Sequence, residues 1–281
     1  MKGDAILPAI RARLDAALAA PHPRYRPWRV DGETLGWIDN ARVERLGRFA
    51  EVFVVTDDAV AFVPALVGVA ARSEAMAVVA RRLHADGELP AWRDELYAVA
   101  PAFDASMTFA LERGAARWFG VRTYAAHVNG YVAGDGGPRL WFARRSAMKA
   151  IDPGMLDNLV GGGIAAGDTV LETVVREAWE EAGIAPHIAR GAQAHRAVRI
   201  RRALPDGLQD ETVHIHDLAL AAGFVPSNQD GEAVDHRLVD LRTAARLLAA
   251  TTGPDVVTVD ASIVTLDFLL RHGVFTPPIP G

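Results

Sequence analysis

The sequence predicts an α/β protein in which a smaller α+β module precedes a larger domain. From residue 123 onward, strand-like runs lie on both sides of one amphipathic helix, and two further helical stretches follow. Before residue 120, short helical and strand-like segments mix without any catalytic spacing of polar residues. We therefore expect a boundary near Gly120, with residues 1–120 as the module and residues 121–281 as the main domain.

The composition is that of a globular protein with a substantial core. Hydrophobic residues make up 50% of the chain, and the formal net charge of −5 argues against a general nucleic-acid binder, which needs a basic surface. With no cysteine, the chain has no thiol nucleophile, disulfide or zinc–thiolate site. Met1–Ala20 carries charges that a signal peptide lacks, and no run reaches the roughly 18 apolar residues of a membrane span. We expect a cytoplasmic protein with no nucleic-acid or membrane partner.

In the first module, periodicity and turn residues predict short elements. The prolines of Pro21–Trp28 predict an extended connector, because proline disfavours helix in the residue before it. Helices are expected over residues 4–20, 73–84 and 106–119, and strands over residues 51–55, 60–63 and 95–99.

In the main domain, the same patterns predict a sheet and its helices. Strands are expected over residues 123–132, 139–144, 195–203 and 212–220, a polar loop over 226–232, and late helices over 239–250 and 261–272. Asn158–Val160 leads into Gly161–Gly163, where the missing side chains let the backbone approach a metal or phosphate closely.

An acidic helix follows this glycine turn within Gly162–Ile184. Asp168 or Thr169 can cap its N-terminus, and Gly183 stands where a left-handed residue is expected at its C-terminus. Apolar residues recur four apart and form a stripe that must pack against the domain: Val170, Val174, Ala178 and Ala182.

Three carboxylates occupy another face of the helix. Glu177 and Glu181 are one turn apart and Glu180 lies between them, so we expect all three to converge beside Arg176. Such a patch is repulsive without a cation, and Mg²⁺ or Mn²⁺ takes carboxylate oxygens while leaving positions for water and substrate phosphate. The competing interpretation is a solvated acidic face, which is what most charge runs are.

The spacing of these residues resembles the Nudix box, G-x5-E-x7-R-E-U-x-E-E-x-G-U, where U is a bulky aliphatic residue. From Gly162 the chain reads G-x5-D-x7-R-E-A-x-E-E-x-G-I. Chance agreement at a given start is on the order of 10⁻⁷, which disfavours the solvated face. Asp168 and Ala178 depart from the pattern, and the shorter Asp168 puts a contact with Arg176 in question. The resemblance implies a Nudix α/β/α sandwich and a Mg²⁺ or Mn²⁺ site that includes the Gly162 carbonyl.

Longer segments resemble the thiamine-diphosphate-type Nudix hydrolases, which include the Nudix domain fused to thiamine pyrophosphokinase in some fungi. They are WRDELYAV (92–99), ERGAARWFGVRTYAAHVNGYV (112–132), LWFARRSAMKAIDPGMLDNLVGGGIAAG (140–167), FVPSNQDGEAV (224–234) and DFLLRHG (267–273). The resemblance implies hydrolysis of thiamine diphosphate, especially its oxidised or damaged analogues, to the monophosphate. It also favours a homodimer.

Several residues have expected roles in this reaction. The expected catalytic residues are Glu177, Glu180, Glu181 and Arg176, with Glu232 as a candidate base outside the box, although a turn glutamate is equally often only exposed. The expected substrate-binding residues are Arg144, Arg145 and Lys149 for the diphosphate, and His127 and Asn129, which alternate along a strand. The candidates to stack on a cationic ring are Trp118, Phe119 and Trp141, all of which equally fit a hydrophobic core.

Two other functions stay open at this point. The same metal chemistry acts on ADP-ribose and other nucleoside diphosphate derivatives. A Nudix module that binds a ligand without cleaving it is a second alternative, although the intact carboxylates argue against it. The first module is expected either to cap the active site or to form a dimer interface.

Overall fold

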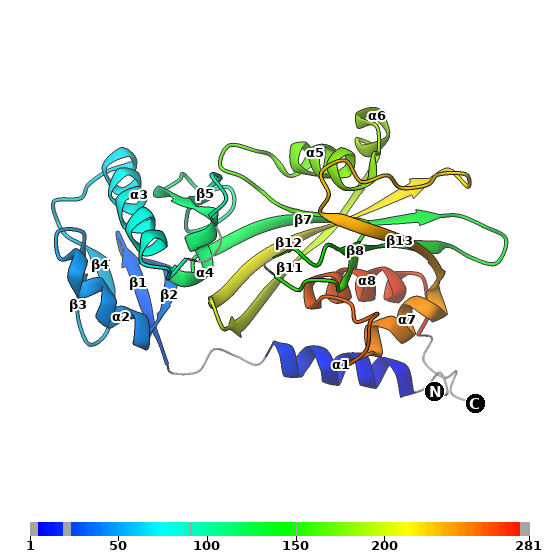
Figure 1. Cartoon of the computed structure of the whole chain (residues 1–281), viewed down its shortest axis with the longest axis horizontal. Helices are drawn as coiled ribbons and strands as arrows, with labels where there is room; N and C mark the ends of the chain where they lie inside the picture. The colour runs from blue at the N-terminus through cyan, green and yellow to red at the C-terminus, as the bar shows by residue number, and fades with distance from the viewer. Residues whose placement is uncertain (1–4, 19–23, 90–91, 150, 276–281) are drawn as a thin grey trace.

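The computed structural model describes residues 5–18, 24–89, 92–149 and 151–275. Figure 1 shows two parts, a smaller one in lighter blue and cyan at the left and a larger one formed around long strands at the right; the dark-blue helix nearest the N-terminus lies below the larger part. The predicted class is confirmed: an N-terminal α+β domain is followed by a three-layered α/β domain. In the described part of the chain, no helix has both the length and the apolar character needed to cross a bilayer.

The N-terminal domain is built on a four-stranded sheet and a separate hairpin. The sheet order is β2 (Glu33–Asp39), β1 (Tyr25–Val30), β4 (Val60–Phe62) and β3 (Phe53–Val55), and the hairpin joins β5 (Leu96–Val99) to β6 (Phe109–Glu112). Its helices are α2 (Asn40–Leu46), α3 (Val69–Ala85) and α4 (Ala116–Phe119), with short 3₁₀ turns at Gly47–Phe49 and Arg113–Ala115. Trp28 lies fully buried at the centre, and four phenylalanine rings have centroids within 5.9 Å of its own: Phe53, Phe62, Phe109 and Phe119.

The predicted helix over residues 106–119 is wrong for most of its length. Its first half is β6, which pairs antiparallel with β5 in a register that places Phe109 opposite Val99. Phe109 and Leu111 alternate into the core, and this burial outweighs the local helical preference. Only α4 is α-helical, and it buries Trp118 and Phe119 in the domain core, so neither can stack on a substrate ring.

The main domain contains a seven-stranded sheet. Its path is β11 (Gln193–Leu204), β12 (Gly207–Leu220), β7 (Arg122–Val132), β8 (Arg139–Arg145) and β13 (Ala233–Asp240); β10 (Val160–Gly163) also pairs with β7, and β9 (Leu156–Asn158) with β8. β12 and β7 are parallel, and the other pairs in this sheet are antiparallel. The sequence prediction missed β13 and started the next helix two residues early, because β13 is defined by its pairing with β8.

Helices cover both faces of this sheet (Figure 1). One face carries α5 (Val170–Ala182) and α6 (Pro186–Ala189), and the other carries α7 (Leu241–Ala249), α8 (Val259–Arg271) and α1 (Ile6–Ala17). The predicted α/β/α sandwich is therefore present.

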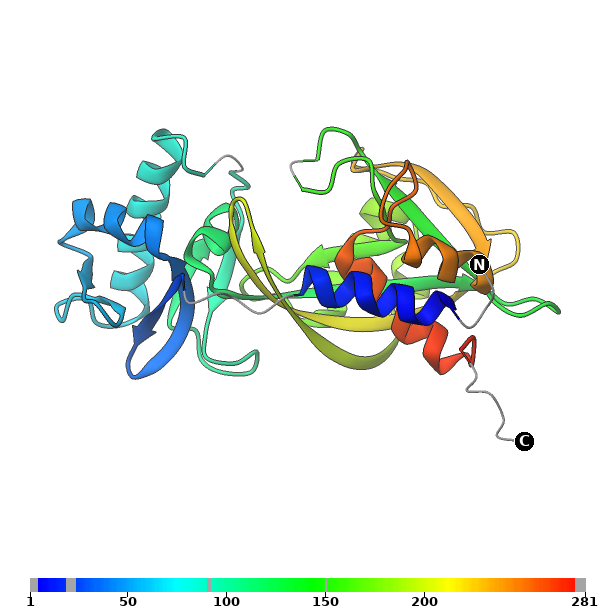
Figure 2. The same cartoon turned by 90° about the horizontal axis from the view of Figure 1, so that it is seen from below.

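Helix α1 packs on the main domain, although a boundary at residue 120 would assign it to the module. Figure 2 shows it running along the larger part of the molecule. Ile10 and Leu14 join the same buried cluster as Leu248 and Phe268, and Arg13 donates to the Leu248 carbonyl at 2.9 Å. Sequence order alone placed this helix in the wrong unit, because its apolar stripe is buried by elements more than 200 residues away.

Candidate active site

Helix α5 forms as its sequence predicts. Thr169 is the N-cap and forms a capping box with Glu172, and Gly183 ends the helix in the left-handed region with φ of 65°. Val174, Ala178 and Ala182 are buried against the sheet. Because both ends and the apolar stripe are fixed, the carboxylates on the adjoining face are held in place.

The glycine triplet leaves room for side chains that lie directly against strand β10. A Cβ added to Gly162 would come within 2.1 Å of Glu177 Cδ, and one added to Gly163 would come within 1.9 Å of the Tyr97 hydroxyl oxygen. Any larger residue would displace these groups. Gly162 and Gly163 are therefore explained by the close approach of one side chain from each domain, and Gly161 lies against the His127 ring in the same way.

The helix carboxylates differ in burial and in partners. Glu177 is only 7% exposed and accepts a hydrogen bond from Arg176 Nη1 at 2.6 Å. The same Arg176 atom lies 3.5 Å from Glu180 Oε2, and the Gly161 N–H donates to Glu181 Oε2 at 2.8 Å. Burial raises the pKa of Glu177, and the charge of Glu180 adds to the effect although Arg176 opposes it. Burial also raises the pKa of Glu181 well above its usual range, with a further contribution from Glu177.

The expected convergence of three carboxylates is not present as a ready-made cluster. Among the described residues, no three His, Asp or Glu side chains are close enough together to hold a metal ion. Arg176 draws Glu177 and Glu180 to itself, while a backbone N–H holds Glu181. Arg176 also lies 3.5 Å from Asp168, so the shorter side chain at that position still reaches it.

The donor set nevertheless fits a hard divalent cation. Glu177 and Glu181 are two desolvated carboxylates whose charges repel each other, and the open backbone of Gly162 runs beside them. These donors are oxygen atoms, which suit Mg²⁺ or Mn²⁺ better than a softer metal. A cation there would take the place of Arg176 as the counter-charge of Glu177.

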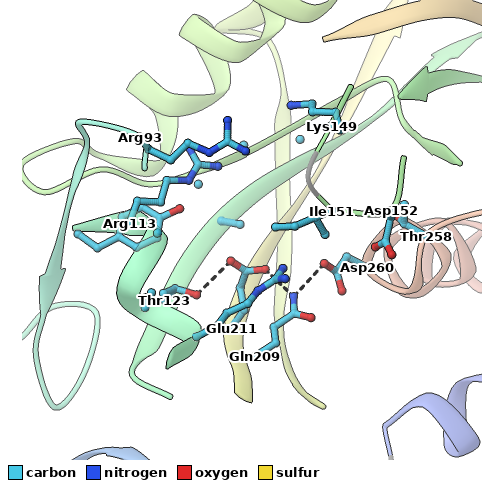
Figure 3. Close-up of a pocket in the computed structure, with 18 of the residues that line it drawn as sticks. Arg93, Arg113, Thr123, Lys149, Ile151, Asp152, Gln209, Glu211, Thr258 and Asp260 are labelled. Atoms are coloured by element: carbon cyan, nitrogen blue, oxygen red, sulfur yellow. Dashed lines mark hydrogen bonds between the residues drawn. The ribbon is translucent and has the colours of Figure 1, made fainter. Parts of the chain in front are cut away.

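A cavity of about 650 Å³ opens in front of these residues, and both domains line it. The N-terminal domain contributes Arg93, Tyr97 and Arg113, and the main domain contributes Glu177, Glu180 and the glycine triplet. Figure 3 shows that Arg93, Arg113 and Lys149 lie toward one end. Lys149 contacts Glu232, which also lines the cavity. Burial lowers the pKa of Lys149, and the nearby Arg145 and Arg93 lower it further.

The opposite end of the cavity carries carboxylates joined by an amide (Figure 3). Gln209, which is 3% exposed, donates through Nε2 to Glu211 at 3.0 Å and to Asp260 at 2.9 Å, and accepts from Arg202 Nε at 2.6 Å. Thr123 donates to Glu211 at 3.0 Å. The second Asp260 oxygen is buried without a hydrogen-bond partner among the described residues. This end therefore presents excess negative charge and a free acceptor.

Two expected substrate-binding residues do not reach the cavity, which corrects their assignment. Arg144 turns away to hold the loop before α8, with Nη2 2.5 Å from Asp255 and Nη1 donating to the Gly154 carbonyl at 2.9 Å. Asn129 is 1% exposed and donates to Asp217 at 3.0 Å inside the domain. Both side chains are occupied by structural partners.

Other expected residues do line the cavity, but with partners of their own. Arg145 is paired with Asp157 at 2.7 Å. The His127 ring shares a hydrogen bond with Asn158 Oδ1 at 2.9 Å and is nearly buried. Trp141 packs at the edge of the hydrophobic cluster behind α5 and is not among the cavity residues.

The sequence prediction left open whether the N-terminal domain caps the active site, and it named no cavity residue of that domain or of strand β12. Arg93 and Arg113 lie in two of the segments that carry the family resemblance, which was the available signal. Gln209, Glu211 and Asp260 carried none, because ordinary polar residues at a strand start and a helix start have no distinctive spacing.

Comparisons with known proteins agree with this organisation. A model of a family described as a domain of unknown function, DUF4743, matches residues 12–123, and the NUDIX domain model matches residues 123–258. The chain is 36% identical to Nudix hydrolase 24, chloroplastic, of Arabidopsis thaliana over 92% of this chain and 70% of that protein. Nudix hydrolase 20, chloroplastic, of the same plant is 35% identical over 92% of this chain and 70% of that protein.

A more distant relative comes from yeast. An uncharacterized Saccharomyces cerevisiae protein, YJR142W, is 29% identical over 71% of this chain and 61% of its own length. Together with the box on α5 and the cavity before it, these matches identify the reaction class. The chain belongs to the Nudix hydrolases, which hydrolyse a diphosphate linkage in a small-molecule substrate.

Proposed function

We propose that the protein hydrolyses thiamine diphosphate, or an oxidised or otherwise damaged form of it, to the monophosphate and phosphate. The observation that carries the proposal is the charge distribution of the cavity. One end has arginine and lysine beside the α5 carboxylates, and the other has Glu211 and Asp260. A diphosphate at the first end and a cationic or donor-rich ring at the second end match these charges.

We propose that Glu177, Glu180, Glu181 and the Gly162 carbonyl hold Mg²⁺ or Mn²⁺. When bound, the ion neutralises diphosphate charge, orients the phosphoryl group and lowers the pKa of a water. Before the ion binds, Arg176 is the counter-charge of two of these carboxylates. Its hydrogen bond to Glu177 and its 3.5 Å contact with Glu180 keep both acids from separating.

Glu232 is proposed to accept the proton of the attacking water. Its carboxylate lines the cavity and contacts Lys149, which restricts its orientation. Lys149 can in turn contact the diphosphate, because it lies at the cationic end. His127 and Arg145 form part of the cavity wall. We propose that they position the substrate indirectly, His127 through its hydrogen bond to Asn158 and Arg145 through its ion pair with Asp157.

The test is a panel of diphosphates assayed with purified protein and Mg²⁺ or Mn²⁺. We expect release of phosphate and monophosphate to be fastest with thiamine diphosphate or its oxidised forms. If ADP-ribose or another nucleoside diphosphate derivative has the higher kcat/KM, that substrate class replaces thiamine. The acidic end of the cavity would then need another role.

Two further expectations remain predictions. The family resemblance favours a homodimer, which a mass measurement in solution by light scattering tests. Cytoplasmic residence is tested by cell fractionation, and the two plant relatives are named as chloroplastic.

A further inference from the structure

The β5–β6 hairpin of the N-terminal domain is fixed directly against the glycine strand of the main domain. The Ala166 N–H donates to the Leu96 carbonyl at 2.8 Å, which joins β5 to the loop that follows β10. Tyr97 lies so close to Gly163 that no Cβ fits between them. The hairpin is therefore placed at the cavity by contacts across the domain junction, and its polar residues have defined positions there.

The segment before β5 is anchored as well. The buried Glu112 carboxylate accepts the Arg93 N–H at 2.8 Å and the Gly114 N–H at 3.1 Å. An N–H bond to a buried carboxylate is a strong, directional contact. The backbone at Arg93 is therefore held at the mouth of the cavity, and only its side chain is left to move.

Arg113 is held on the cavity wall with donors to spare. Its Nη1 donates to Glu95 at 2.6 Å, and its guanidinium lies 5.6 Å from the centre of the Tyr97 ring. Burial lowers its pKa, but Tyr97, Glu95 and Glu177 together hold that pKa above the ordinary value, so the group stays charged. A guanidinium has five N–H donors, and the bond to Glu95 uses one of them.

The Arg93 side chain is exposed and lines the cavity. Among the described residues, no carboxylate pairs with its guanidinium, and Figure 3 shows it at the same end of the cavity as Lys149 and Arg113. Its proximity contributes to the lowered pKa of Lys149. Like charges gathered around a cavity are unfavourable unless an anion lies between them.

We propose that Arg93 and Arg113 bind the terminal phosphate of the substrate, so that the N-terminal domain completes the active site. The inference rests on the proposed function, in which the organic group lies toward Glu211 and Asp260. The terminal phosphate then lies at the opposite end, where both arginines are. A free terminal phosphate has three oxygens that can accept paired hydrogen bonds from a guanidinium group. Esterification of that phosphate removes one of its negative charges and one of these acceptor oxygens. The domain therefore selects diphosphate monoesters over diesters such as ADP-ribose.

The experiment measures binding without hydrolysis. Calorimetry in EDTA compares methylenediphosphonate, which has two free ends, with its P,P′-dimethyl ester, which has none. The proteins are the full chain as wild type, Arg93→Gln and Arg113→Gln, with Arg81→Gln as the matched control. Arg81 is an exposed arginine of the same domain on α3 and does not line the cavity.

We expect Arg93→Gln to weaken binding of the free diphosphonate by about tenfold, since one charge-assisted contact is lost, and to leave binding of the ester unchanged. Arg81→Gln should match wild type with both probes. The proposal is overturned if Arg93→Gln binds both probes as wild type does, or loses both equally. Arg113→Gln can fail to fold because Arg113 is paired with Glu95, but Arg93 is exposed and its variant decides the matter alone.

Steady-state kinetics with the best substrate of the panel distinguish a role of Arg93 in substrate binding from a purely structural role. Arg93→Gln should raise KM while kcat stays within about twofold, as for loss of a contact made equally in ground and transition states. An unchanged KM with a reduced kcat would contradict the binding role. If thiamine diphosphate is not cleaved but diphosphonate binding still depends on Arg93, the proposed substrate fails and this inference stands.

Discussion

The two ends of the cavity differ in how their charges are satisfied. At the acidic end, Gln209 uses both amide protons and its carbonyl to hold Glu211, Asp260 and Arg202 in one network. At the cationic end, Arg93 has no carboxylate partner among the described residues, and the pKa of Glu181 is far above its usual range. The acidic end is organised before anything binds, whereas the end near α5 carries unfavourable charge.

This difference separates recognition from chemistry. The hydrogen bonds of Gln209 hold this network in place, and the buried Asp260 oxygen that has no partner among the described residues leaves one acceptor for a ligand. Desolvated acids and a cation with no carboxylate partner among the described residues are electrostatically unfavourable, and the proposed metal and diphosphate would relieve both. We therefore expect substitutions of the α5 carboxylates to lower the rate, and substitutions at the acidic end to change which organic group is preferred.

The largest effect is expected for the carboxylates of α5. Glu180→Gln and Glu181→Gln should each lower kcat by about 10²- to 10³-fold, the range observed when one electrostatic stabiliser of a transition state is removed. Steady-state assays with saturating Mg²⁺ measure this. Glu172→Gln, on the same helix but in the capping box, should retain wild-type kcat. Full activity in both site variants would remove them from the metal site.

Glu232 is the next strongest test of the α5 end. If it is the base, Glu232→Ala should lose about 10²-fold or more in kcat at neutral pH and recover part of it at high pH, where hydroxide replaces the base. The pH–rate profile measures this. The alternative is that Glu232→Ala acts only by releasing Lys149 from its ion pair. In that case, adding Glu232→Ala to a Lys149→Met variant should have no further effect on kcat. An unaltered profile would rule out the role.

The acidic end should control selectivity. Glu211→Gln removes one charge but can keep the hydrogen bond from Thr123. We expect kcat/KM to fall about tenfold for a diphosphate with a cationic ring and to stay nearly constant for one with a neutral ring, since ~1.4 kcal/mol is a factor of ten. Glu33→Gln, on the exposed start of β2, is the control. Equal losses on both substrates would mean that the two ends do not divide recognition from chemistry.

The smallest effect concerns stability. Because the pKa of Glu181 is raised in the folded protein, the folded state binds the proton more tightly than the unfolded state does, and stability falls as pH rises above the ordinary value of 4.5. In EDTA at neutral pH, Glu181→Gln should therefore melt higher than wild type by roughly 2 to 4 °C, the shift that ~1 kcal/mol gives at this size.

The pH dependence of this difference in melting temperature, and a second variant on the same helix, provide the control. The difference between Glu181→Gln and wild type should shrink toward zero below pH 4.5, where both side chains are neutral. Glu172 behaves in the opposite way, because hydrogen bonds from Thr169 lower its pKa. Glu172→Gln should then melt slightly lower than wild type at neutral pH. A lower melting temperature for Glu181→Gln in EDTA would show that its charge is not strained.

Much of the fold followed from local patterns in the sequence. Helix α5 was predicted from its caps and apolar stripe, because both are set by residues within one helix length. The helix predicted over residues 106–119 failed because the pairing of β6 with β5 and the burial of Phe109 are not visible in a local window. Strand β13 was missed for the same reason, since its residues alternate weakly and its partner β8 lies far away in the chain.

The candidate site divides in the same way. Glu177, Glu180 and Glu181 are fixed on one face of a helix by spacing, so the sequence located them. Arg144 was assigned by its place before the glycine turn and Asn129 by alternation along a strand, but their side chains are hydrogen-bonded to Asp255 and Asp217.

By itself, the sequence determined the reaction class, because the spacing of the acidic residues on one helix is set by the helical repeat. The tertiary structure decided which charges face the substrate. Arg93 and Arg113 from one domain meet Lys149 from the other in one cavity, and Arg176 holds Glu177 and Glu180. Electrostatic interactions depend on distance in space and on burial, and neither quantity can be read from the order of residues.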